Sequence, residues 1–438
     1  MTSQTWLNPK LVSQSVWFHY MVITVPDVID TEDFATLYIG SGHNGDEPPT
    51  EKDEEVKMTL ELALYTKLIT ATLKQIPNQP ITFSEDPIKK RRTEDAMIAY
   101  TWKHFVLNSS EPEYLARLPM TKAVVRALDT IVEVVRKYKG LTISRFGVAG
   151  ASKRGWTTWT AALVDTRIIA ITPLVLDVIN LKPILHHMYR AYDGWTFAFK
   201  DYFEVGVTTE LDSAVFDELL AIVDPYSYID RYKRDNISIL LINTCGDEFM
   251  MPDDNLYFWD KLPGPKYLKM LPNAEHSMVG HLLGTMMDVG SFMLSVVNNY
   301  KLPEVSWRFD NKNNLARVYF TSDVQPIRVR FWHATTLQDN IKRDFRLLAG
   351  PDPNSPTPQL IFWKEGKVTG TQGNNSYTYM GEINQPTVGW SGCFIEASYG
   401  LQIKERIDLF QVTSQVNIVP DKFPFPDCSG QGCKGKLV

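Results

Sequence analysis

One serine, set between an apolar strand and a helix, constrains this chain more than any other feature. It lies within Val148-Ala-Gly-Ala-Ser-Lys-Arg-Gly-Trp-Thr157. Hydrophobic patterning predicts a buried strand over 141–149 and a helix over 153–164. In a nucleophile elbow the serine stands at the carboxyl end of such a strand, and the N–H of the next residue helps to form the oxyanion hole. Ser152 is therefore the candidate nucleophile, and Lys153 is a candidate oxyanion donor.

The turn departs from the common Gly-x-Ser-x-Gly pattern, because Arg154 occupies the last position and a glycine follows one residue later. Gly150 and Gly155 would relieve crowding in a sharp turn, since glycine has no Cβ. The structural alternative is a glycine-rich turn in which Ser152 only caps a helix.

A base and an acid follow downstream in the order that this kind of site requires, which is Ser, acid, His. The predicted strand 237–243 runs into a turn that carries Asp247, and the predicted strand 266–271 opens into a loop that carries His276. Sites assemble at the carboxyl edge of a parallel sheet. We therefore expect Asp247 to be the triad acid and His276 to be the base.

Other residues could fill these roles. Asp247 could instead cap a helix that begins near Asp253. Glu248 and Asp254 are alternative acids, and His281 is the alternative base. No His-Glu-x-x-His pair or clustered Cys/His spacing is present, so no metal is expected. The glycine spacing also matches neither a P-loop nor Gly-x-Gly-x-x-Gly, so we expect no cofactor.

The second half of the oxyanion hole is predicted after an early strand. Residues 33–39 lead into the glycine-rich segment 40–45, in which Gly42 and His43 are the candidate donors. A plain surface turn is the alternative for this segment. The Lys153 ammonium could bring positive charge to the same oxygen, or could extend into solvent.

Four motifs carry a family resemblance: Thr2-Ser-Gln-Thr-Trp6, Gly150-Ala-Ser-Lys-Arg-Gly-Trp156, Gly246-Asp-Glu-Phe249 and Pro272-Asn-Ala-Glu-His-Ser277. The chain resembles the PhoPQ-activated pathogenicity-related family, which includes the eukaryotic autocrine proliferation repressor protein A group. The resemblance implies an α/β-hydrolase-like fold with Ser152, Asp247 and His276 at triad positions. Eukaryotic members are similar to secreted growth-restraining factors, so the resemblance implies signalling as readily as digestion.

We expect the protein to be secreted or to reside in the endolysosomal lumen. The family motif usually follows a signal peptide and an upstream strand, whereas here it begins at Thr2. If the recorded start is a truncation, both are missing from this version, and residues 1–25 contain no signal peptide. Sequons at Asn108, Asn236 and Asn374 favour secretion and glycosylation. No apolar segment approaches the roughly 20 residues of a membrane span.

Charge and cysteine content limit the possible partners and reactive groups of the protein. The net charge of −6 argues against nucleic acid as a partner. The basic run Lys89-Lys-Arg-Arg92 is interpreted as a solvated face. Cys428 and Cys433 are close enough for a small disulfide in the tail, and Cys245 is interpreted as a buried thiol.

The order of elements indicates an α/β fold with a mostly parallel sheet covered on both faces. Strands are predicted near 16–25, 34–39, 79–83, 141–149, 168–176, 237–243 and 266–271. Helices are predicted near 53–75, 93–106, 117–138, 153–164, 253–261 and 277–299. These elements make up an α/β-hydrolase-like domain over 1–300.

An aromatic-rich insertion over 180–235 interrupts the alternation and is predicted to be a helical cap over the site. Tyr192 and Trp195 are the candidate substrate-binding residues; the alternative is that the aromatics form the core of the cap. Alternating patterning over 303–415 predicts a β-sandwich domain, followed by an extended Pro/Gly/Cys tail over 416–438.

The sequence therefore predicts a serine hydrolase that forms an acyl-enzyme, with a small-molecule or peptide substrate. Whether it is a peptidase or a carboxylic ester hydrolase is left open. The competing hypothesis is a non-catalytic secreted signalling protein on a hydrolase scaffold, which acts by binding a cell-surface receptor.

Overall fold

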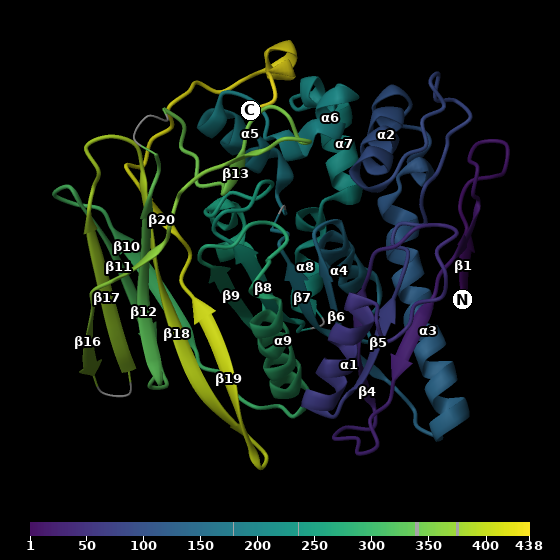
Figure 1. The fold of residues 1–438 in the computed structure, drawn as a ribbon, viewed down its shortest axis with the longest axis horizontal. Helices are drawn as coiled ribbons and strands as arrows, with labels where there is room; N and C mark the ends of the chain where they lie inside the picture. The colour runs from purple at the N-terminus through teal and green to yellow at the C-terminus, as the bar shows by residue number, and fades with distance from the viewer. Residues whose placement is uncertain (178, 235, 338–340, 374–375) are drawn as a thin grey trace. The chain divides into compact units, whose positions relative to one another are not determined.

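The protein is described by a computed structural model that covers residues 1–438 except 178, 235, 338–340 and 374–375 (Figure 1). The chain forms two compact units. Unit 1 comprises Met1–Ile179, Asp201–Ile239 and Leu262–Pro265. Unit 2 comprises Asn180–Lys200, Leu240–Lys261 and Lys266–Val438.

The centre of unit 1 is a mostly parallel sheet, as the sequence predicts. Its strands lie in the order β3 (Met21–Thr24), β5 (Ile69–Leu73), β4 (Phe34–Ile39), β6 (Arg145–Ala151) and β7 (Ile168–Leu174). The β4/β5, β4/β6 and β6/β7 pairs are parallel, whereas β3 is antiparallel to β5. Strands β4 and β5 are buried at every position, which requires cover on both faces of the sheet.

The helices of unit 1 begin and end at recognisable signals. The Asp53 carboxylate caps α1 by accepting from the amides of Glu55 and Val56. Helix α3 buries one apolar stripe and ends at Gly140, whose φ of 74° suits glycine. The α-helices that begin before the insertion are α1 (Glu54–Thr66), α2 (Glu94–Leu107), α3 (Arg117–Lys139) and α4 (Lys153–Val164).

The insertion is helical, as predicted, and its residues divide between the two units. Its segments are α5 (Leu181–Tyr192), η2 (Phe197–Phe199), α6 (Lys200–Glu204), η3 (Val207–Glu210), α7 (Ala214–Val223), η4 (Pro225–Tyr228) and α8 (Asp230–Arg234). Residues 180–200 belong to unit 2 and residues 201–239 belong to unit 1.

Several predicted elements are wrong in extent. The predicted strand 16–25 is two strands, β2 (Val16–Phe18) and β3 (Met21–Thr24), in different sheets. The predicted helix 53–75 contains strand β5, because the helix stops at Lys67 with a left-handed φ of 56° and a buried β-branched run follows. Residues 79–83 form only isolated bridges, since Pro80 has no N–H to donate. The predicted helix 253–261 is two short 3₁₀ turns, η5 (Asp254–Tyr257) and η6 (Trp259–Lys261).

Unit 2 contains a β-sandwich, which confirms the predicted class of the C-terminal part (Figure 1). One sheet has the order β10-β11-β17-β16, and the other has the order β15-β12-β18-β19, with β20 paired to β18. The Tyr399 hydroxyl donates to Ser322 Oγ at 2.9 Å, joining β18 to β11 across the two sheets. The strands are β10 (Val305–Asp310), β11 (Leu315–Ser322), β12 (Arg328–Thr335), β15 (Lys364–Gly366), β16 (Val368–Gly373), β17 (Ser376–Asn384), β18 (Ser391–Ile403), β19 (Arg406–Thr413) and β20 (Asn417–Val419).

The remaining elements are short or follow the α/β pattern. The residues of β8 (Ser238–Thr244) are divided between units 1 and 2 after Ile239. Unit 2 also contains β9 (Lys266–Leu271) and α9 (Leu282–Val297). The short strands are β1 (Thr2–Thr5), β2 (Val16–Phe18), β13 (Leu348–Ala349) and β14 (Thr357–Pro358), and the remaining 3₁₀ turns are η1 (Pro112–Tyr114) and η7 (Gly430–Lys434).

The tail is less extended than expected, because it contains β20 and η7. A disulfide joins Cys428 to Cys433, as the sequence predicts, and Cys245 is a buried free thiol. Burial raises the pKa of that thiol well above its ordinary value, which makes it a poor nucleophile.

Two of the three predicted sequons can be placed in the structure. Asn108 and Asn236 are exposed, whereas the sequon residue Asn374 lies outside the described residues. Among the described helices, none combines the length and the apolar character that crossing a bilayer requires.

The basic run before α2 is only partly a solvated face. Lys89, Lys90 and Arg91 are exposed, as predicted. Arg92 is 6% exposed, and its guanidinium lies 2.9 Å from the buried Asp86 carboxylate. The sequence could not show this burial, because the partner carboxylate is positioned by a turn.

We expect Asp86→Ala to destabilise the protein by about 3–5 kcal/mol, because it leaves the Arg92 guanidinium buried without its carboxylate. Glu61→Ala is the control, since it breaks an exposed pair with Lys57 at 3.9 Å and should cost at most about 0.5 kcal/mol. Urea unfolding followed by tryptophan fluorescence measures both. Equal losses in the two variants would show that the Asp86 pair has no special structural role.

Candidate active site

Ser152 occupies a strained turn between β6 and α4. Its backbone has φ of 54° and ψ of −129°, a conformation that residues other than glycine rarely adopt. Such a conformation persists only where the surrounding structure enforces it, and a nucleophile elbow is one such turn. The Ser152 side chain makes no capping hydrogen bond to α4, so the structure does not support the capping alternative.

Two glycines leave the space that this turn needs. A Cβ on Gly150 would lie 2.8 Å from the carbonyl oxygen of Arg154. A Cβ on Gly155 would lie 3.0 Å from the Cβ of Leu176 and 3.1 Å from the carbonyl oxygen of Gly150. The close start of helix α4 against the strands therefore requires glycine at position 150 and leaves only a tight fit for a side chain at position 155.

The segment after β4 leaves the sheet beside Ser152. Strands β4 and β6 are parallel neighbours in which Ile39 pairs with Gly150, so both chains leave at the same edge. The amides of Gly40, Ser41, His43 and Asn44 donate to other atoms of the protein. Among the described residues, the amide of Gly42 has no hydrogen-bond acceptor. The His43 side chain is exposed.

The Lys153 side chain neither reaches solvent nor remains unpaired. Its ammonium lies 2.9 Å from Glu94 and 2.8 Å from Asp95, and the residue is 9% exposed. Arg154 donates to Glu94 at 2.6 Å, and Arg117 donates to the Lys153 carbonyl oxygen at 2.9 Å. Burial alone would raise the pKa of Glu94, but the two cations outweigh it and lower that pKa to about 2.

These ion pairs fix the first turn of α4 and with it the Lys153 amide. That amide belongs to the helix N-terminus, where backbone N–H groups lack partners within the helix. Sequence reasoning missed Glu94 and Asp95. The only signal was two acids at the start of the predicted helix 93–106, a position that acids favour for the helix dipole alone.

Asp247 and His276 form a close pair within unit 2. The Nδ1 atom of His276 lies 3.0 Å and 2.9 Å from the two Asp247 oxygens. Asp247 also accepts from the amides of Phe249 and Met250, at 2.7 and 3.1 Å. These bonds hold a buried carboxylate against one ring nitrogen and fix the orientation of the imidazole.

The alternative acids and base have other partners. Glu248 Oε2 accepts from the backbone N–H of His276 at 3.0 Å, which fastens the loop that carries the imidazole. Asp254 pairs with Nδ1 of His187 at 2.8 Å. His281 is half-buried at the N-cap of α9. Burial and the charge of Asp247 raise the pKa of Glu248 to about 7.

Tyr192 and Trp195 are buried in unit 2, at 2% and 0% exposure. The Trp195 indole donates to the carbonyl oxygen of Cys433 at 3.0 Å. The Arg346 guanidinium lies over the Tyr192 ring, 4.3 Å from its centroid. Both side chains pack as core residues against the C-terminal part of unit 2, rather than only within the insertion.

Two clusters of described residues offer ligand atoms within 4.8 Å of one another: Asp247, Glu248 and His276, and His186, Asp427 and Cys428. In the first cluster, Nδ1 of His276 is already hydrogen-bonded to Asp247. In the second cluster, the sulfur of Cys428 is bonded in the disulfide.

The candidate site residues thus form two groups, one in each unit. Ser152, Lys153 and Gly42 lie at one edge of the sheet of unit 1, and Asp247 and His276 lie together in unit 2. A parallel sheet with a strained serine turn, a helical insertion and a C-terminal β-sandwich defines an α/β-hydrolase-like protein.

Sequence comparison assigns the family. Residues 1–346 match the model of the PhoPQ-activated pathogenicity-related protein family. The chain is 38% identical over 451 residues to "Autocrine proliferation repressor protein A" of Dictyostelium discoideum, covering 99% of this chain and 88% of that protein. The chain therefore belongs to the PhoPQ-activated pathogenicity-related family, as its motifs predict.

Solved structures give more distant matches. An acetyl xylan esterase from Paenibacillus sp. R4 has a TM-score of 0.44 at 14% identity and covers 63% of this chain and 79% of its own. Est1E from Butyrivibrio proteoclasticus has a TM-score of 0.37 at 13% identity, covering 63% and 93%. An acylaminoacyl peptidase from Pyrococcus horikoshii has a TM-score of 0.40 at 13% identity, covering 65% and 42%.

The raised pKa of Glu248 predicts how its removal acts at different pH values. Because this carboxyl binds its proton more tightly in the folded state, the folded protein loses stability as the pH rises from about 4.5, the pKa of the unfolded state, to about 7. Glu248→Gln removes that cost and keeps an acceptor for the His276 amide. Its stability relative to the wild type should therefore increase by on the order of 2 kcal/mol between pH 5 and pH 8.

Urea unfolding at the two pH values measures this change. Glu248→Ala is the companion variant, because it also removes the acceptor and should lose about 1 kcal/mol relative to Glu248→Gln at both pH values. A stability difference between Glu248→Gln and the wild type that does not change with pH would contradict the assignment.

Proposed function

We propose that the protein is a serine hydrolase in which Ser152, His276 and Asp247 form a catalytic triad. The observation that carries the proposal is the strained backbone of Ser152, which lies between Gly150, where a Cβ would clash, and Gly155, where a Cβ would fit only tightly. The Asp247–His276 pair supports it, because it holds Nδ1 and so orients the ring whose Nε2 is the proposed base.

In the proposed reaction Nε2 of His276 takes the proton of the Ser152 hydroxyl as Oγ attacks the substrate carbonyl carbon. The amides of Gly42 and Lys153 donate to the oxyanion, and Asp247 stabilises the imidazolium. The imidazolium then protonates the leaving alcohol or amine, which leaves an acyl-enzyme. Water, deprotonated by His276, releases the acid and restores Ser152.

The substrates we propose are carboxylic esters or peptide amides, of small molecules or of peptides. Both proceed through the same tetrahedral intermediate, so the triad alone does not separate an esterase from a peptidase. Parallel assays with p-nitrophenyl acetate and with dipeptide amides would separate the two activities.

Ser152→Ala should leave the fold intact and lower kcat by on the order of 10⁴ or more, since the nucleophile is lost. Ser144→Ala is the matched control, because Ser144 precedes β6 and its exposed hydroxyl is 3.5 Å from Asp33. Circular dichroism checks folding. Residual activity of Ser152→Ala within about tenfold of the wild type would refute the nucleophile assignment.

Labelling with a fluorophosphonate probe tests the same triad without a known substrate. We expect mass spectrometry to find the label on Ser152, and His276→Ala to lose it. Folded wild-type protein that takes no label would count against a catalytic triad.

A second candidate is a secreted signalling protein that acts by binding a cell-surface receptor. The name of the 38%-identical relative, an autocrine proliferation repressor, favours it. If receptor binding is the whole function, Ser152→Ala should retain full effect in a cell-proliferation assay while losing turnover. Loss of both would tie the effect to catalysis.

A further inference from the structure

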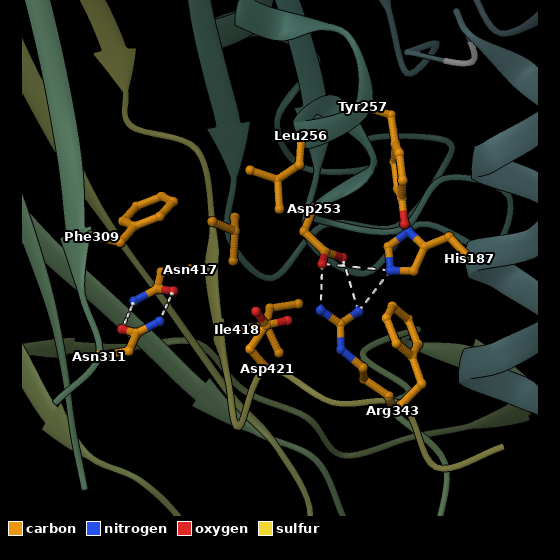
Figure 2. Close-up of a pocket in the computed structure, with 12 residues that line it drawn as sticks. His187, Asp253, Leu256, Tyr257, Phe309, Asn311, Arg343, Asn417, Ile418 and Asp421 are labelled. Atoms are coloured by element: carbon orange, nitrogen blue, oxygen red, sulfur yellow. Dashed lines mark hydrogen bonds and ion pairs between the residues drawn. The ribbon is translucent and has the colours of Figure 1, made fainter. Parts of the chain in front are cut away.

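Unit 2 contains a pocket of about 300 Å³ that the proposed reaction does not use (Figure 2). It is lined by residues of α5, η5, β10 and β20 and by the segments around Arg343 and Asp421. All of its lining residues lie in unit 2 and are described. Its size is at the lower end of the range for small-molecule sites.

One wall is a rigid polar group of three side chains that point toward one another (Figure 2). Both terminal nitrogens of the Arg343 guanidinium donate to Asp253, one of them at 3.2 Å. The guanidinium also donates to Nε2 of His187 at 2.9 Å, so the ring hydrogen lies on Nδ1 and faces Asp254. Arg343 is 4% exposed, and its position is therefore fixed from several sides.

Arg343 keeps one donor unused. Among the described residues, its buried Nε has no hydrogen-bond partner. A buried donor on a charged group without an acceptor is costly, typically by 1–3 kcal/mol or more. Because this Nε is itself buried, the wall offers its fixed polar group to the pocket but no free guanidinium donor.

The far side of the pocket offers amide and carboxylate groups. Asn311 and Asn417 face each other and exchange two hydrogen bonds, of 3.1 and 2.8 Å (Figure 2). This pairing uses one N–H of each amide, and exposed Asn311 therefore keeps a further N–H to donate. The exposed Asp421 carboxylate lies between the two sides and accepts no hydrogen bond from described residues (Figure 2).

Apolar surface completes the lining, through Phe309, Tyr257 and Leu256. The formal charges of Asp253 and Arg343 cancel, which leaves Asp421 as the excess charge. A net negative lining disfavours anions. Donors, acceptors and aromatic faces that alternate over a small volume match a molecule with several hydroxyl groups and apolar C–H faces.

We propose that this pocket binds a neutral polyhydroxylated ligand, a single saccharide unit, through Asn311 and Asp421. One hydroxyl donates to the Asp421 carboxylate, and another accepts from the Asn311 amide. The C–H face of the sugar packs against the aromatic lining.

The test is saturation-transfer NMR and thermal shift on the full chain with D-glucose, D-galactose, D-mannose, D-xylose and N-acetylglucosamine. We expect at least one sugar to bind with millimolar affinity. Asn311→Ala and Asp421→Asn should weaken that binding by about tenfold or more, as loss of a hydrogen bond to a charged or polar group does. Both residues are exposed, so the variants should fold, which circular dichroism verifies.

Asp27→Ala is the control, because it removes an exposed carboxylate in unit 1 and should leave sugar binding unchanged. Acetate and tetramethylammonium serve as charged probes. The proposal is overturned if no sugar binds saturably, if the two pocket variants bind as the wild type does, or if only a charged probe binds.

Discussion

Helix α4 starts so close behind strand β6 that a Cβ on Gly150 would clash with the backbone of the helix, and a Cβ on Gly155 would fit only tightly. That closeness forces the intervening Ser152 into a backbone conformation that a serine rarely adopts. It also brings the first amide of α4 next to the serine. The parallel register of β4 and β6 then sets the Gly42 loop at the same sheet edge. The candidate nucleophile and both candidate oxyanion donors thus follow from one close approach of backbone to backbone.

The charged residues around this turn hold it in place. Lys153 is buried, and it is stabilised there only because Glu94 and Asp95 pair with its ammonium. A buried ion pair contributes little net stability, because desolvation offsets most of the attraction, yet removing one partner is costly. Such a network therefore favours one geometry over others more than it stabilises the fold. Its effect here is to fix the direction in which the N-terminal amides of α4 point.

Adjacent carboxyl groups on the turn after β8 have different environments. Asp247 accepts hydrogen bonds from the imidazole of His276 and from two backbone amides. Glu248 accepts one backbone N–H and lies beside the charge of its neighbour, which with burial raises its pKa to about 7. Environments that differ in this way assign different roles to like groups. Asp247 orients the imidazole, and Glu248 positions the loop on which the imidazole is carried.

The sequence by itself determined the features that depend on local pattern: the serine turn after an apolar run, the strand and helix alternation, and the change to alternating patterning in the β-sandwich. It failed where a residue's environment is supplied from far along the chain. Residues 69–73 are predicted to be helical, but they form a strand because a parallel neighbour pairs with them. Arg92 is predicted to be solvated, but it is buried in an ion pair with Asp86. The indole of Trp195 packs on residues more than two hundred positions away. Periodicity reports which face of an element is apolar, whereas only tertiary packing decides which distant group meets that face, and therefore which charges are buried.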